Sequence, residues 1–195
     1  MKRRSAAIAA LVVFALAAAW VLFIGLPRWY AARRAQATTA SATGTSSTPA
    51  AAVRKITATL FYVADDGMAL VPAQREVPFG ESAAEQARAI LEAQLAPAGQ
   101  LSAIPAGVVL RDVFVTERGD AFVSLSAEIT ARHPGGSLAE LFTVYTIVNA
   151  LTANLPAIAH VQILVEGKEV DTLAGHVDLR HPLAKSLEWV VHDTQ

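Results

Sequence analysis

The stretch ITATLFYV, residues 56–63, decides the fold. Its β-branched and aromatic residues, in partly alternating order, predict a β-strand. The turn signal Asp65-Asp66-Gly67 follows directly. A second strand is predicted over Ala69 to Val77. Proline has no N–H for a neighbouring strand, so Pro72 and Pro78 are expected either on a strand at the edge of the sheet or at the ends of the strand. The folded part of the chain is therefore expected to open with a hairpin.

A helix is predicted after this hairpin. Ser82 and Glu85 have the spacing of a capping box, in which the serine accepts an early helical N–H and the glutamate reaches back to the serine N–H. Pro97 ends the helix because it cannot continue the backbone hydrogen bonding. Apolar residues recur at helical spacing between these limits: Ala83, Ala87, Ile90, Leu91 and Leu95.

Similar elements follow to the end of the chain. Strands are predicted over Val108 to Thr116 and Ala121 to Ser126, joined by a turn. Ser137 and Glu140 repeat the capping-box spacing before a long helix that ends before Pro156. A last hairpin is predicted around the two-residue turn Glu166-Gly167, from strands at residues 161–165 and 168–170.

The predicted order of elements is β-β-α-β-β-α-β-β. Strands joined as hairpins, with two helices between them, are typical of an α+β fold. We therefore expect two helices packed on one face of an antiparallel or mixed sheet. The edges of such a sheet are candidates for the addition of a strand from a partner.

A membrane anchor and a linker are predicted before this domain. Residues 6–26 follow a short basic tail (1–5) and contain no charged residue. A helix of that length spans about 32 Å, close to the roughly 30 Å hydrocarbon core of a bilayer. Residues 27–52, rich in Ala, Thr and Ser, are predicted to be a flexible linker. The folded domain is assigned to residues 53–195.

Two other interpretations of the apolar run are a buried core helix and a cleaved signal peptide. A signal peptide has a shorter apolar region, and the nearest small-residue site, Ala35-Gln36-Ala37, lies beyond two arginines, so an uncleaved anchor is favoured. Basic residues flank the run on both sides. The positive-inside rule therefore favours a cytoplasmic N-terminus only slightly, and a domain that faces the cytoplasm is the alternative.

The net charge is −1, but positive and negative residues are distributed unevenly along the chain. Six basic residues and no acidic one precede Val53, whereas all 17 acidic residues and ten basic ones follow, so the remainder carries about −7. Such an acidic body repels phosphate backbones, which argues against nucleic-acid binding. The sequence has no cysteine, which excludes disulfides, thiolate nucleophiles and cysteine-based metal sites.

The sequence contains no glycine-rich phosphate loop, no G-x-S-x-G motif and no H-E-x-x-H motif. One polar cluster is a candidate metal or acid–base site: His176 and Asp178 share one side of an extended segment, and His181 follows. The alternative is a structural turn in which Asp178 accepts backbone N–H groups. We favour the turn, because nothing in the spacing fixes a third ligand. No catalytic, cofactor-binding or metal-binding residue is therefore assigned.

Other polar residues are interpreted structurally. Asn149 lies on or near the apolar face of the second helix, where a buried, hydrogen-bonded amide fixes the register of the helix, and contact with a ligand is the alternative. His133 precedes Pro134 in a loop that is either solvated or in contact with a partner. The carboxylates of the helices are interpreted as caps, complements of the helix dipole and solvated side chains: Glu81, Glu85, Glu92 and Glu140.

These segments resemble the GerMN domain, the sporulation and spore-germination domain. The resemblance covers about residues 56–187 and rests on packing and turn signatures: IPAG at 104–107, GGS at 135–137, YTIVNALT at 145–152, VQILVEG at 161–167 and GHVD at 175–178. Ala96, Val108 and Ala150 stand where members often have Gly, Thr and Thr, which affects a turn, a strand start and a helix contact. The resemblance implies a non-enzymatic, extracytoplasmic bacterial domain, often carried on a membrane anchor or a lipoprotein.

Anchor, linker and domain together predict a single-pass protein of the cytoplasmic membrane with an interaction or scaffold domain in the cell envelope. The expected partner is an envelope protein, another copy of the chain or a cell-wall polymer, with no cofactor. A link to sporulation or germination is implied by the resemblance alone. The alternative function is a metal-assisted envelope hydrolase that uses His176, Asp178 and His181.

Overall fold

The computed structural model describes residues 54–191. The predicted basic tail (1–5), membrane anchor (6–26) and linker (27–52) lie outside the described residues and stay predictions. Within the described part of the chain, no helix is both long and apolar enough to cross a membrane.

The described chain begins with the expected hairpin. β1 (Lys55–Val63) and β2 (Leu70–Pro78) pair antiparallel in an unbroken register and form a two-stranded sheet of their own. In the turn between them, Asp66 Oδ1 accepts the Met68 N–H at 2.9 Å, and Gly67 has a φ of 71°. In this turn the aspartate side chain accepts a backbone N–H and the glycine adopts a positive φ, which are the roles that these residue types commonly have in turns.

Helix α3 (Ala83–Leu95) has the predicted bounds and the predicted cap. Ser82 Oγ accepts the Glu85 N–H at 3.2 Å, and Glu85 Oε2 accepts the Ser82 N–H at 3.2 Å. Gly80 lies so close to the following helix that an added Cβ would come within 2.4 Å of the Gln86 backbone nitrogen. A reciprocal cap and a position that excludes any larger residue thus fix the start of the helix.

The second sheet is mixed. β3 (Leu110–Val115) and β4 (Asp120–Leu125) form the predicted antiparallel hairpin, and β4 pairs in parallel with β5 (His160–Val165). β5 pairs antiparallel with two short strands, β6 (Lys168–Glu169) and β7 (Leu183–Ala184). The parallel pair β4–β5 requires a long crossover, because a tight turn cannot join parallel strands.

Two helices lie in that crossover. The single-turn helix α4 (Glu128–Ala131) was not predicted. The long helix α5 (Ser137–Thr152) was predicted, but its capping box was not correct: the N-cap residue is Gly136, and no side chain caps the helix there. The Glu140 carboxylate instead binds backbone N–H groups of residues 173–176.

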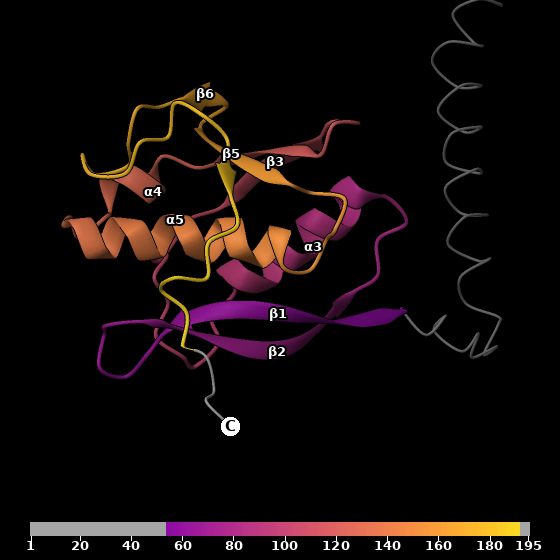
Figure 1. Ribbon diagram of the computed structural model, residues 1–195, viewed down its shortest axis with the longest axis horizontal. Helices are drawn as coiled ribbons and strands as arrows, with labels where there is room; N and C mark the ends of the chain where they lie inside the picture. Colours follow the sequence, from indigo (N-terminus) through magenta and orange to yellow (C-terminus); the bar gives the residue numbers. More distant parts are fainter. Residues whose placement is uncertain (1–53, 192–195) are drawn as a thin grey trace, which may run out of the picture. The chain divides into compact units, whose positions relative to one another are not determined.

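The two long helices lie between the two sheets, with the β1–β2 hairpin on one side and the mixed sheet on the other (Figure 1). The α+β class and the mixed pairing are as expected, but the single sheet with both helices on one face is wrong. The burial of α5 gives the reason. Ten of its 16 residues are buried and it contacts both β1 and β5, so the helix packs against both layers.

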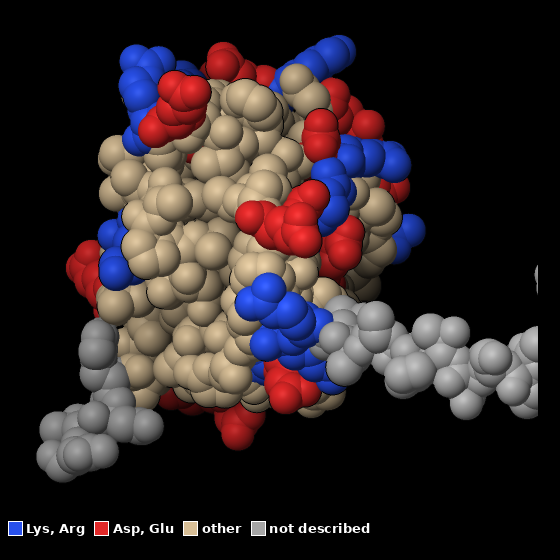
Figure 2. Space-filling view, turned by 90° about the vertical axis from the view of Figure 1, so that its right-hand side faces the viewer, with Lys and Arg blue, Asp and Glu red and all other residues tan. Residues whose placement is uncertain are grey.

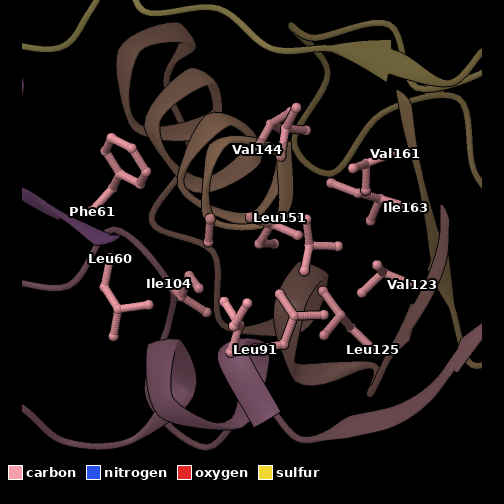
Figure 3. Close-up of a cluster of buried hydrophobic side chains, with 14 of the residues drawn as sticks. Leu60, Phe61, Leu91, Ile104, Val123, Leu125, Val144, Leu151, Val161 and Ile163 are labelled. Carbon is pink, nitrogen blue, oxygen red and sulfur yellow. The ribbon is translucent and has the colours of Figure 1, made fainter. Parts of the chain in front are cut away.

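One hydrophobic core joins the three layers (Figure 3). Leu60 of β1 lies on one side of the helices and Val123 of β4 on the other, with Leu151 of α5 between them, and all three side chains are fully buried. Burial of each such side chain contributes about 1.5–3 kcal/mol. Both sheets are therefore held to the helices by the same core.

Candidate interaction site

The candidate metal cluster does not assemble. Residues 175–177 form bends rather than a strand, so the alternation that would align His176 with Asp178 is absent. His176 Nδ1 lies 3.2 Å from Glu140 Oε2, whereas Asp178 binds the Arg180 guanidinium at 2.7 and 2.9 Å. Among residues 54–191, no three metal-ligating side chains gather.

Asp178 instead stabilises a turn, the interpretation favoured from the sequence. Its Oδ1 accepts the Arg180 backbone N–H at 3.0 Å. The hydrogen bonds from the Arg180 side chain and backbone hold the pKa of Asp178 well below its usual range. The carboxylate is thus already engaged by its own neighbour, and the geometry gives no support to a hydrolase centred on His176, Asp178 and His181.

Glu140 is fully buried, although it was predicted to cap a helix or to be solvated. Its carboxylate accepts the backbone N–H groups of Leu173, Ala174 and His176 at 2.7–2.8 Å. Burial by itself raises the pKa of Glu140, but these hydrogen bonds, together with the one from the His176 side chain, lower it further than burial raises it. The ionised side chain therefore ties residues 173–176 to α5.

Asn149 and His133 also hold the fold. Asn149 is buried as predicted, and its amide exchanges two hydrogen bonds with the Ser186 backbone, at 2.7 and 3.1 Å. His133 is half-buried: its Nδ1 accepts the Gly135 N–H at 3.0 Å, and its Nε2 lies 3.2 Å from Thr143 Oγ1. These contacts shape the loop before α5, which borders the groove described below.

Side chains close the outer edge of β1. The Gln94 amide accepts the Phe61 N–H at 2.9 Å and donates to the Phe61 C=O at 2.8 Å. Asn154 makes the corresponding pair of bonds to Thr59, at 2.8 and 2.7 Å. Two carboxamides thus take the place of a neighbouring strand along the middle of β1.

The outer edge of β2 offers few donors. Every second residue of β2 points its backbone groups away from β1. Of these residues, Pro72 and Pro78 have no N–H, and Leu70 already exchanges bonds with Trp189 and Val191, at 2.7 and 2.8 Å. Such an edge is a poor template for strand addition.

The edge of the mixed sheet at β3 is also disturbed. The register of β3 shifts between Leu110 and Asp112, as in a β-bulge, and Asp112 Oδ1 accepts the Val113 N–H at 2.8 Å. Bulges and capped donors are devices that protect sheet edges. The hypothesis that a partner adds a strand here is therefore poorly supported.

Three adjoining pockets lie along the loop between α3 and β3, and we call them together the binding groove. The first has a volume of about 710 Å³ and no charged residue in its lining, which consists of Tyr62, residues 95–100 and 102–108, and Pro134. The second has about 540 Å³ and is also uncharged, lined by Val63, Gly67, residues 101–103 and 134–139, and Phe142. Volumes of this order are typical of ligand sites.

The pockets share walls. Ser102, Ala103 and Pro134 line both the first and the second pocket. A third pocket of about 600 Å³ adjoins both and is acidic, because Asp65 and Asp66 are among its lining residues. The binding groove therefore consists of two uncharged pockets on either side of a short loop segment, with a carboxylate-lined pocket beside them.

Tyr62 gives the groove an unsatisfied polar group. Its side chain is 2% exposed, lines the first and third pockets, and has a hydroxyl without a hydrogen-bond partner in residues 54–191. Burial raises the pKa of Tyr62, and the nearby Arg75 offsets this only in part, so the phenol is neutral at physiological pH. An unpartnered buried hydroxyl costs about 1–3 kcal/mol, which a bound ligand with a polar group can recover.

The loop that lines the groove also has backbone N–H groups without a protein acceptor. Within the described residues, the N–H groups of residues 98–103 have no acceptor, whereas the loop is fastened through its carbonyls. The Leu101 C=O accepts the Val63 N–H at 2.8 Å, and the Ala103 C=O accepts the Thr143 hydroxyl at 2.7 Å. The loop thus presents free donors beside two apolar pockets.

Sequence reasoning did not find this groove. Its walls come from β1, the loop after α3 and the loop before α5, and each was interpreted only as a strand or a turn. The single local signal is the pair of uncharged Pro- and Gly-containing turns at 96–99 and 104–107, which enclose the exposed Leu101. Without the fold, that signal does not show that Tyr62 lies against them.

Charge does not mark a second site on the face shown in Figure 2. Lys and Arg lie beside Asp and Glu there, with uncharged areas between them. Exposed ion pairs of the domain include Lys55–Glu76 at 3.1 Å and Arg88–Asp112 at 2.8 Å, and such pairs contribute about 1 kcal/mol at most. That face offers no basic stripe for a phosphate backbone.

Comparison with protein families decides the family. The Germane model, described as sporulation and spore germination, matches residues 59–171. The chain belongs to the Germane family. The match confirms the resemblance to the GerMN domain, and it includes every residue that lines the binding groove.

Solved structures are similar to this Germane domain. The tandem GerMN domains of the sporulation protein GerM from Bacillus subtilis match with 18% identity and a TM-score of 0.53, over 67% of this chain and 46% of that one. The chain thus spans about half of the tandem structure. The first GerMN domain of the same protein matches with 21% identity and a TM-score of 0.49, over 67% and 95% of the two chains.

A Clostridium perfringens protein described as a lipoprotein has 21% identity to the chain and a TM-score of 0.49, over 69% of this chain and 90% of that one. No curated protein matches the chain. The Germane match ends at residue 171, so the segment that Glu140 and Asn149 hold against α5 lies beyond it.

Proposed function

We propose that this Germane domain is a polypeptide-binding module of the bacterial cell envelope, without enzymatic activity, and that the binding groove is its interaction site. The observation that carries the proposal is the groove itself, in which two uncharged pockets flank a row of free backbone N–H groups beside the buried Tyr62 hydroxyl. Apolar pockets with a few fixed polar groups are the usual form of a recognition site.

Sequence and family support the proposed location. The uncharged run at residues 6–26 is long enough to span a bilayer, and the linker after it has a typical reach of about 25 Å. The GerM protein that shares the fold is a sporulation protein. We therefore place the domain outside the cytoplasmic membrane on a single-pass anchor, in an envelope assembly of the kind that serves sporulation or germination.

A protein partner fits the groove better than a cell-wall polymer does. The first two pockets are uncharged, and the aromatic residues in their linings, Tyr62 and Phe142, are both buried, so they offer little aromatic surface for stacking of sugar rings. Apolar side chains fill such pockets well, and a polypeptide backbone has the carbonyl groups that the N–H row of residues 98–103 requires.

Photo-crosslinking in intact cells tests the proposal. Benzoyl-phenylalanine replaces Gln100, which lines the groove, and in a matched chain it replaces Glu169, which is exposed on β6. We expect a covalent adduct with a polypeptide from position 100 and none from position 169. Equal adducts from both positions, or no polypeptide adduct from position 100, would overturn the assignment of the groove.

A further inference from the structure

We propose that the binding groove selects a segment with two apolar side chains and a neighbouring Lys or Arg, and that the Tyr62 hydroxyl binds a main-chain carbonyl of that segment. This inference rests on the proposed function and names the chemistry of the partner. It follows from the order of the pockets: two are uncharged and the adjoining third is acidic.

The two uncharged pockets account for the two apolar side chains. They lie on either side of the wall formed by Ser102 and Ala103, and both also contact Pro134. A single compact ligand would fill one of them and leave the other empty. An extended polypeptide crosses the shared wall and places separate side chains in the two pockets, as in other peptide-recognition grooves.

The third pocket accounts for the basic residue. Asp65 and Asp66 are exposed, and no lysine or arginine lines this pocket. One Asp66 oxygen accepts the Met68 N–H at 2.9 Å, which orients that carboxylate. An incoming cation therefore meets two carboxylates, whereas an incoming anion meets like charge in a domain that is already acidic.

Tyr62 lies where the first and third pockets meet. Its hydroxyl and Thr146 Oγ1 are the buried side-chain polar atoms that have no hydrogen-bond partner within residues 54–191, and of the two residues only Tyr62 lines the groove. A phenol donates readily to a carbonyl. Removal of this hydroxyl should therefore have opposite effects on the free and the bound protein. The free domain loses an unsatisfied group, whereas the complex loses a hydrogen bond.

The test uses the full chain, purified in a mild detergent and immobilised, with a phage-displayed library of random dodecapeptides as the probe. We expect the selected peptides to share two apolar residues and an adjacent Lys or Arg. A labelled peptide of the selected sequence then reports binding by fluorescence anisotropy. Tyr62→Phe should weaken its binding about two- to tenfold, with the melting temperature unchanged or raised.

Matched variants complete the test. Tyr145→Phe, which removes a partly buried hydroxyl from α5, and Asp171→Asn, which removes an exposed charge outside the groove, should leave binding unchanged. The double change Asp65→Asn and Asp66→Asn should weaken binding and remove most of its dependence on salt.

Three outcomes overturn the inference: selected peptides without a basic residue, no enriched sequence at all, or Tyr62→Phe binding as tightly as the native chain. Binding of phosphatidylglycerol vesicles that Tyr62→Phe abolishes, with no peptide selected, would assign the groove to lipid instead. Failure here combined with a polypeptide adduct from position 100 in cells would leave the proposed function standing.

Discussion

At the scale of single residues, Glu140 shows how one carboxylate organises a distant segment. Buried side chains of this type occur only when hydrogen bonds replace their water. Here three backbone N–H groups and the His176 ring supply those bonds. Residues 173–176 have little regular structure of their own, so the carboxylate substitutes for the hydrogen bonds that a strand or helix would give them.

Glu140→Gln should destabilise the domain by about 2–4 kcal/mol, because an amide has one acceptor oxygen and brings an NH₂ group against donors. Glu92→Gln, an exposed position on α3, is the matched control and should change the free energy of unfolding by less than about 0.5 kcal/mol. Urea denaturation of both variants measures the difference. Equal stabilities would contradict the role given to Glu140.

The same carboxylate predicts a dependence on pH. Its pKa in the folded state is lowered from the ordinary glutamate value of 4.5, so the unfolded state binds the proton first as the pH falls. The stability that Glu140 contributes is therefore complete above about pH 4.5 and is lost as the pH falls through the folded-state pKa. The gap in unfolding free energy between the native chain and Glu140→Gln should narrow on acidification. A constant gap from neutral to acidic pH would refute this linkage.

Two capping-box patterns illustrate what local sequence does and does not decide. Ser82 and Glu85 form the predicted cap, because the donors that reach the exposed glutamate, the N–H groups of Glu81 and Ser82, are both local. Ser137 and Glu140 have the same spacing, yet the glutamate turns inward to N–H groups more than 30 residues away in the sequence. The spacing of a motif therefore predicts a helix start, whereas the partner of its side chain depends on tertiary packing.

At the scale of elements, the closed edge of β1 is the most testable feature. Gln94→Ala should cost about 2–3 kcal/mol, because it removes two hydrogen bonds and leaves the buried Phe61 N–H and C=O unpaired. Gln74→Ala is the control: this glutamine is exposed on β2 and makes one surface bond to Thr59. Thermal unfolding followed by circular dichroism separates the two, and a Gln94→Ala domain as stable as the control would argue against edge closure by side chains.

The positions of β1, β2 and α3 along the chain were predictable from the sequence, but the arrangement of the strands in two sheets was not. β1, β2 and α3 lie within one residue of their predicted bounds, because strand alternation, turn residues and helix caps act locally. Period-two alternation shows that a strand has a buried face, but it does not show which sheet the strand joins. The division into two sheets, and the groove that Tyr62, Leu101 and Pro134 form together, depend on packing between segments far apart in the chain.

At the scale of the whole molecule, the core and the binding groove both belong to the described residues. The described residues 54–191 share a single hydrophobic core. The binding groove is built from residues 62–142 alone. The anchor and linker stay predictions, and we expect them to set where the domain operates.

The last prediction concerns that location. The full chain should sediment with the membrane fraction, whereas a chain that starts at Ala52 should stay in the supernatant and unfold cooperatively, because the uncharged run at 6–26 is long enough to hold the protein in a bilayer. Alkaline phosphatase fused after Gln195 should be active, since that enzyme folds only outside the cytoplasm.

Replacement of the basic residues Lys2, Arg3 and Arg4 by neutral ones is the variant that tests the predicted orientation. It removes the slight excess of positive charge on the predicted cytoplasmic side, so phosphatase activity should fall. Activity confined to a cytoplasmic reporter in the native chain would reverse the orientation, and full-length protein in the supernatant would remove the anchor.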